Sequence, residues 1–159
     1  MIRRESARGW TLLEMLAVMT IAAIVSAGAM LNIGAAQGRI LAGEGERLAA
    51  LLSSARDESV LANLTMRVRL TESGYRFEAE RNGASVEASS EDLFRPRVFP
   101  EGIRLESAQS SEPREGAETT LIFTPWGDDS DFDLLLTDGR RRARVRGDAK
   151  AIHAEPEGA

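Results

Sequence analysis

The hydrophobic pattern divides the chain into three stretches. From Met15 to Gly38 there are 24 consecutive residues without a charge, rich in Leu, Ile, Val, Met and Ala. About 20 such residues are enough for a helix to span a bilayer, so this stretch is predicted to be a membrane helix. Apolar residues at helical spacing come next, and short alternating stretches follow them. This order predicts an α+β chain in which a long N-terminal helix packs on an antiparallel sheet.

The second stretch, residues 39–63, is predicted to be an amphipathic helix. Residues such as Arg47 and Asp57 lie away from the centre of its apolar face. A helix that covers a protein core has such a stripe. We therefore expect one long helix whose second half covers the following domain. The apolar and small residues of the stripe are Leu41, Leu48, Leu51, Leu52, Ala55, Ser59 and Ala62.

Residues 64–154 are predicted to form the sheet region. Its candidate strands are short and are separated by turn signals such as Asn82-Gly83 and Asp138-Gly139. Two polar segments, Ser85–Ser90 and Ser107–Glu118, are predicted to be exposed loops. The candidate strands are Met66–Thr71, Tyr75–Glu80, Val98–Phe99, Ile103–Glu106, Thr119–Thr124, Phe132–Thr137, Arg141–Arg146 and Ala149–His153.

The arginines near the N-terminus predict the orientation of the membrane helix. Arg3, Arg4 and Arg8 precede the apolar stretch, and no arginine lies inside it. By the positive-inside rule, the N-terminus is cytoplasmic and the rest of this single-pass chain lies across the membrane. A cleaved secretory signal peptide is the alternative. Its apolar region has only ~7–15 residues and ends in a small-residue cleavage site, whereas this stretch is longer.

Glu14 is unexpected because it stands within an otherwise apolar run. A charged carboxylate at the centre of a membrane helix costs at least ~2.5 kcal/mol, so it is expected to face a partner. The simpler alternative is a position near the headgroups at the start of the helix, where negative charge suits the helix dipole.

The residues from Gly9 to Leu16, GWTLLEML, resemble the class III signal of type IV pilins and type II secretion pseudopilins. In that family, prepilin peptidase cuts after the Gly and methylates the new N-terminus. The resemblance implies a cut between Gly9 and Trp10, although the family usually has Phe where Trp10 stands. It also implies a leader over residues 1–9, a transmembrane helix over 10–38 and a periplasmic pilin-like domain over 39–159.

The same resemblance implies a role for Glu14 in filament assembly. After the cut, the new amino group lies four residues before Glu14, and residues at this spacing share a helix face. The family implies that this carboxylate pairs with the N-terminus of a neighbouring subunit. Such a pair would set the axial register of one subunit against the next.

Later segments resemble the H-type minor pseudopilin, namely Leu48–Glu58, Gly74–Phe77 and Leu121–Gly127. The resemblance implies a structural subunit at or near the tip of the type II secretion pseudopilus, which helps to export folded proteins across the outer membrane. Its implied partners are other minor and major pseudopilins, prepilin peptidase, the inner-membrane secretion platform and secreted substrates. The alternatives are a minor type IV pilin in pilus assembly, adhesion or DNA uptake, and a membrane-anchored periplasmic enzyme or binding protein.

The sequence gives little support for catalysis, and no catalytic residue, metal ligand or cofactor is assigned. The chain has no cysteine, and its one histidine, His153, is expected to be exposed. An acidic cluster follows Trp126, but it lacks the central Gly and distal Glu of an EF-hand. We interpret it as a solvated turn between strands, with calcium binding as the alternative. Its members are Asp128, Asp129, Asp131 and Asp133.

One basic run, residues 139–147, stands out in an acidic chain. The net charge of −5 becomes −7 once the leader is removed, which argues against a general polyanion binder. A charged edge strand that blocks aggregation is the first interpretation of the run. A protein-binding strand is the second, and DNA binding, as in minor pilins of natural transformation, is the third. Alternation places Arg140, Arg142, Arg144 and Arg146 on one face and Arg141, Ala143 and Val145 on the other.

Overall fold

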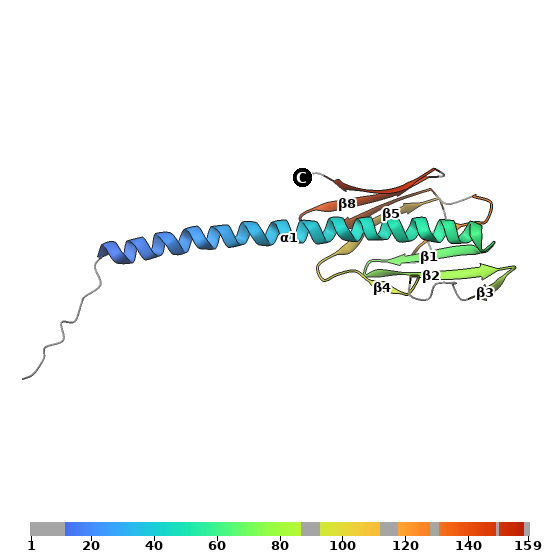
Figure 1. Cartoon of the computed structure of the whole chain (residues 1–159), viewed down its shortest axis with the longest axis horizontal. Helices are drawn as coiled ribbons and strands as arrows, with labels where there is room; N and C mark the ends of the chain where they lie inside the picture. The colour runs from blue at the N-terminus through green and yellow to red at the C-terminus, as the bar shows by residue number, and fades with distance from the viewer. Residues whose placement is uncertain (1–11, 87–92, 112–117, 128–130, 149, 158–159) are drawn as a thin grey trace, which may run out of the picture. The chain divides into compact units, whose positions relative to one another are not determined.

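The structure is a computed structural model that describes residues 12–86, 93–111, 118–127, 131–148 and 150–157, with the side chains of 28–36, 85 and 86 left out. The chain is divided into two compact units, Met1–Ala36 and Gln37–Ala159. Among the described residues the order is one helix followed by nine strands (Figure 1). The second unit contains both sheets.

Helix α1 runs over Leu12–Leu61. In the first unit its described side chains, residues 12–27, are exposed. Within the described residues, no helical stretch is both long enough and apolar enough to cross a membrane.

In the second unit, α1 turns the predicted stripe inward. Leu48, Leu52, Ala55 and Ser59 have no exposed surface. The helix ends at Leu61, two residues before the predicted end. Asn63 then adopts a left-handed conformation (φ 51°), and the backbone N–H of Leu64 donates to the Ser59 carbonyl at 3.1 Å. A left-handed residue at this position satisfies carbonyl groups that the last helical turn leaves without partners.

The predicted sheet is divided into two antiparallel sheets. The first has the order β3-β2-β1-β6, and β4 also pairs with β2. Asn82 and Gly83 both have positive φ, as a two-residue hairpin turn between β2 and β3 requires. The bounds of these strands are β1 Thr65–Thr71, β2 Gly74–Arg81, β3 Ala84–Val86, β4 Arg97–Val98 and β6 Thr119–Phe123.

The second sheet has the order β5-β7-β8-β9. Among the described residues, the hydrogen bonds that join it to the first sheet or its turns include Leu105 N–H to the Glu72 carbonyl at 3.0 Å and Ser110 Oγ to the Thr120 carbonyl at 3.2 Å. The strands are β5 Arg104–Ser110, β7 Phe132–Thr137, β8 Arg142–Gly147 and β9 Ile152–Glu157.

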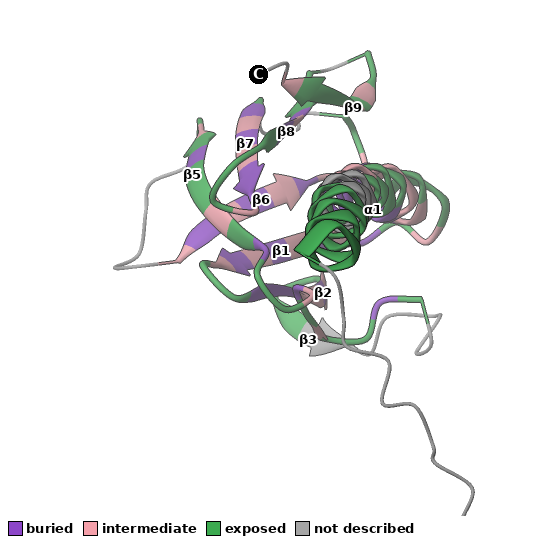
Figure 2. Cartoon of the chain, turned by 90° about the vertical axis from the view of Figure 1, so that its left-hand side faces the viewer, coloured by how far each residue is buried: buried purple, intermediate pink, exposed green. Residues whose placement is uncertain are grey.

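The core lies between α1 and the inner faces of both sheets. Along β1, β6, β7 and β8, buried residues alternate with more exposed ones, as half-buried strands require. Figure 2 shows buried stretches on strands of both sheets and a largely exposed β9. The fully buried side chains in this core include Leu48, Leu52, Met66, Val68, Leu70, Leu121, Phe123, Leu134, Leu136 and Val145.

Several other predicted boundaries also differ from the structure. Ser107–Ser110 continue β5 although three of the four residues are polar, because each of them pairs with a residue of β7. Ser85 lies in β3, and the rest of that predicted loop falls largely outside the described residues, as do residues 112–117. The last strand begins at Ile152 rather than Ala149. The Asp148 carboxylate accepts hydrogen bonds from the backbone N–H groups of Lys150 and Ala151, at 2.7 and 2.9 Å. These residues therefore form a turn, and the strand begins after it.

Candidate functional site

The predicted processing and assembly residues lie near the start of the chain. Gly9 and Trp10 are outside the described residues. Glu14 lies in the first turn of α1 and is exposed. A carboxylate at this position is favoured by the helix dipole, which leaves partial positive charge at the N-terminus.

The basic run does not form one continuous strand face. Arg140 lies in the turn between β7 and β8, not on the strand, and Arg141 is exposed in the same turn instead of facing inward. Asp138 sets this turn, because its Oδ1 atom accepts the backbone N–H groups of Arg140 and Arg141 at 2.8 and 2.7 Å. Gly139 has a φ of 88°, which other residues seldom adopt.

The prediction of an edge strand is also wrong, because β8 lies between β7 and β9. The alternation itself is confirmed within the strand, where Ala143 and Val145 are buried and Arg142, Arg144 and Arg146 are not. Each of these arginines pairs with an acidic residue of another strand in the same sheet. The pairs are Arg142 with Glu106 at 2.8 Å, Arg144 with Glu157 at 2.7 Å and Arg146 with Asp133 at 3.0 Å.

These pairs neutralise most of the positive charge on the outer face of β8. Arg142 meets Glu106 with two hydrogen bonds of 2.8 Å, a geometry that matches the guanidinium fork to a carboxylate. The hydrogen bond from Arg142 lowers the pKa of Glu106, so the acid stays charged. A surface whose arginines are already matched by acids offers little to a polyanion, and this disfavours the DNA-binding interpretation of the strand.

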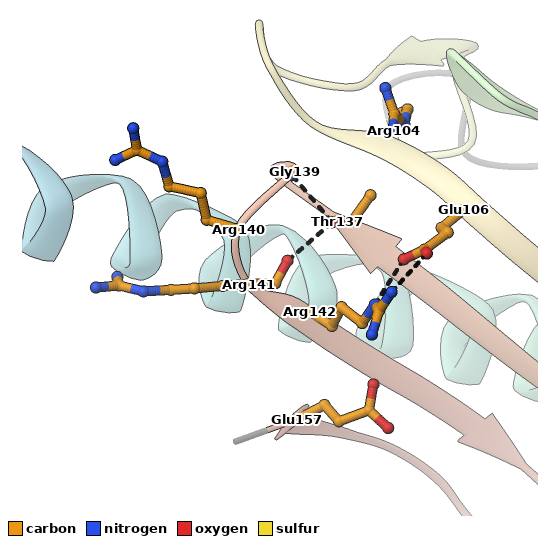
Figure 3. A pocket seen from close by; sticks show the side chains of 8 residues that line it. All are labelled: Arg104, Glu106, Thr137, Gly139, Arg140, Arg141, Arg142 and Glu157. Atoms are coloured by element: carbon orange, nitrogen blue, oxygen red, sulfur yellow. Dashed lines mark hydrogen bonds and ion pairs between the residues drawn. The ribbon is translucent and has the colours of Figure 1, made fainter. Parts of the chain in front are cut away.

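A cavity of about 480 Å³ lies at the end of this sheet, where β7 turns into β8. The acids on its wall, Glu106 and Glu157, are both paired to β8 arginines. Figure 3 shows Arg140 and Arg141 extending together away from these acids. The charge of Arg104 also acts on Glu106, whereas the guanidinium group of Arg140 forms no hydrogen bond or ion pair with the described residues. The cavity is lined by Arg104, Glu106, Thr137, Gly139, Arg140, Arg141, Arg142 and Glu157.

A second polar cluster, centred on Glu44, was missed in the sequence. Glu44 is only 3% exposed, although it lies on α1 between polar and small residues. The Tyr75 hydroxyl donates to its carboxylate at 3.4 Å, and Arg47 pairs with it at 2.9 Å. The available signal was helical spacing, because Glu44 follows Leu41 by three residues and precedes Leu48 by four, within the apolar stripe.

The cluster has altered acid–base properties. Burial raises the pKa of Glu44, and the charge of Arg47 and the hydrogen bond from Tyr75 offset only part of this rise. Burial, together with the nearby Glu44 charge, raises the pKa of Tyr75 to about 12. Tyr75 therefore remains a hydroxyl donor throughout the physiological range.

We predict that Glu44→Gln reduces the pH dependence of stability. Because the folded-state pKa of Glu44 lies above its ordinary value of 4.5, the folded protein binds more protons than the unfolded chain just above that pH. Its free energy of unfolding must then fall as the pH rises through this window, whereas Gln at this position does not titrate. Urea unfolding at pH values below 4.5 and at neutral pH measures the difference. A variant with the wild-type pH dependence would contradict the assignment.

The acidic cluster and the histidine gain no chemical role from the structure. Asp128 and Asp129 lie outside the described residues, and Asp133 is paired with Arg146. Over the part of the chain with described positions, no group of three or more potential ligands is arranged to hold a metal ion. His153 is exposed, with Glu155 3.7 Å away.

Comparison with known proteins gives two sequence matches and one structural match. Residues 44–150 match the family described as Type II transport protein GspH, and residues 5–30 match the prokaryotic N-terminal methylation motif. No curated protein sequence matches the chain. The fold resembles the minor pseudopilin EpsH from the Type 2 Secretion System of Vibrio cholerae. The TM-score is 0.59 at 15% identity, over 75% of this chain and 99% of that one.

These matches agree with the architecture. The GspH match covers most of the second unit, and the methylation motif includes Glu14 and lies before it. Together they indicate a protein anchored in the inner membrane with a periplasmic domain. The helix and two antiparallel sheets are the fold shared with EpsH. Since the family match spans more than half of the sequence, the chain belongs to the Type II transport protein GspH family and is a minor pseudopilin, a structural component of type II secretion and not an enzyme.

Proposed function

We propose that this minor pseudopilin is cut between Gly9 and Trp10 and held in the inner membrane by residues 10–38, with its N-terminus in the cytoplasm. It then joins the pseudopilus at or near the tip, where it helps to push folded proteins through the outer membrane. The observation that carries this proposal is the order of the two matches, a methylation motif at residues 5–30 followed by a GspH domain at 44–150.

Glu14 is the proposed assembly residue. It lies in the first turn of α1 and its side chain is exposed, so a neighbouring subunit can reach it. In lipid, a carboxylate and an amino group each carry a large insertion cost, which pairing reduces. A pair between Glu14 of one subunit and the N-terminus of the next therefore favours one axial position over others.

The β domain is proposed to face outward from the filament. In this position it contacts other minor and major pseudopilins, and secreted substrates reach the same surface. Before assembly, the chain meets prepilin peptidase and the secretion platform in the inner membrane. Of the arginines predicted to bind partners, Arg142, Arg144 and Arg146 are paired within the domain, so Arg140 is the one best placed for an external contact.

Mass spectrometry of the mature N-terminus tests the proposed processing. We expect co-expression with prepilin peptidase to give a chain that begins at Trp10 and carries one added methyl group. The control is expression beside a catalytically inactive peptidase, which should leave Met1 in place. A chain that keeps its first nine residues beside the active peptidase would overturn the proposed route into the filament.

A further inference from the structure

We propose that the turn carrying Arg140 and Arg141, together with Arg39, binds the phosphate groups of anionic phospholipid headgroups. This inference rests on the proposed function, because it requires residues 10–38 to lie in the membrane. Its occupant is the lipid surface from which that segment emerges. The arginines would hold the domain against this surface until the subunit enters the filament.

The turn lies beside the first residues of the second compact unit. The second compact unit begins at Gln37, so Gly38 and Arg39 are among its first residues. Arg141 packs directly on Gly38: a side chain added there would overlap the Arg141 guanidinium. A smaller cavity of about 220 Å³, lined by both residues, continues the contact. The turn between β7 and β8 therefore lies where the chain enters the domain.

The cavity beside the turn carries more positive than negative side chains. The large cavity beside the turn has four arginines on its wall against two glutamates. Both glutamates are already paired, Glu106 with Arg142 and Glu157 with Arg144. Arg39 and Arg140 are exposed and form no hydrogen bond or ion pair with the residues that the structure describes. Positive charge thus exceeds negative charge at this end of the domain, although the whole chain is acidic.

Arginine side chains are well suited to bind the phosphate groups of lipids. Guanidinium groups bind phosphate oxygens through paired N–H donors, and their long side chains reach the headgroup level while the backbone stays outside. Figure 3 shows Arg140 and Arg141 extended in the same direction, so both can reach one surface. Asp138 and Gly139 hold the turn through backbone interactions, so the two guanidinium groups are not needed to form it.

Lipid selectivity of the full chain tests this inference. The chain is reconstituted in phosphatidylcholine vesicles, and spin-labelled phosphatidylglycerol and phosphatidylcholine are compared as probes of the lipid next to the protein. We expect wild type to prefer phosphatidylglycerol at low salt. Arg140→Gln combined with Arg141→Gln should reduce this preference by about fivefold or more, given the usual contribution of each arginine near an anionic surface. The preference should also weaken as salt is added.

A matched control removes the same charge at the opposite end of the domain. Arg81 donates to the Ala62 carbonyl just beyond the end of α1, and Arg146 lies near the far end of β8. Gly38 and Leu61 are separated by 23 helical steps, which correspond to roughly 35 Å. Arg81→Gln combined with Arg146→Gln should therefore keep the wild-type lipid preference. If both double variants lose the preference for phosphatidylglycerol equally, the preference comes from net charge alone and the proposed local site is wrong.

Two further outcomes are decisive. If the wild-type chain shows no preference for phosphatidylglycerol, the lipid site is wrong and the surplus charge serves an acidic protein partner. If inorganic phosphate displaces the lipid more than chloride does at equal ionic strength, the turn is a site for free phosphate. Alkaline extraction distinguishes failure of the proposed function, because a chain that leaves the vesicles entirely is not membrane-anchored.

Discussion

Replacing Glu14 with Ala should leave N-terminal processing intact but abolish incorporation into the pseudopilus. The amino group of a neighbouring subunit would then lack its proposed partner in lipid. An unpaired charge there costs at least ~2.5 kcal/mol, which corresponds to more than tenfold in an equilibrium. We therefore expect at least a tenfold loss of the subunit from sheared pseudopili, together with a loss of substrate secretion. Both are measured by immunoblotting in a strain that lacks the native copy.

The matched control for this variant is Glu46→Ala. Glu46 is an exposed glutamate on the same helix, so its removal changes the net charge by the same amount. We expect this variant to be processed, assembled and active in secretion. Normal assembly of the Glu14 variant would refute the role given to that carboxylate, whereas failure of cleavage would place the effect at the peptidase.

Leu52→Ala should cause a large loss of stability. Leu52 has no exposed surface and packs in the core between α1 and the sheets. Truncation of a buried Leu costs about 2–5 kcal/mol, because contacts are lost and a cavity remains. This is a large share of the ~5–15 kcal/mol that separates a folded domain from its unfolded chain. Urea unfolding of the full chain in detergent, followed by circular dichroism, measures the effect.

Leu61→Ala provides the same chemical change on the same helix at an exposed site. Leu61 is 83% exposed, so its truncation should change the free energy of unfolding by no more than ~0.5 kcal/mol. Similar losses for the two variants would mean that the helix does not use the Leu52 face to cover the sheets.

Local patterns account for the elements that the sequence predicts well. The stripe that includes Leu48 and Leu52 is buried as expected, because helical periodicity determines which residues share a face. The turn at Asn82-Gly83 has the positive φ values that these residues tolerate. The alternation within β8 is likewise correct, since a strand places successive side chains on opposite faces.

The sequence pattern does not show which strands lie next to one another in a sheet. Periodicity shows which way Arg142 and Arg144 point, but it does not show that β8 lies inside a sheet with Glu106 and Glu157 on either side. That arrangement depends on pairing between segments far apart in the chain. The division into two sheets has the same origin. The burial of Glu44 was missed because a carboxylate normally argues for an exposed position. Its partners are Arg47, on the same helix, and Tyr75, from a strand that the sequence pattern does not place beside it.

The edge strand β9 has a consequence for how subunits meet. Pro156 has no backbone N–H, and a proline fits within a paired strand only where its nitrogen faces away from the neighbouring strand. The outer edge of β9 therefore lacks a donor at its C-terminal end, and the carboxylates of Glu155 and Glu157 flank that position. Strand addition from an adjacent pseudopilin is disfavoured along this edge. Contacts that this edge makes with another subunit are therefore expected to use side chains and not the pairing of backbones.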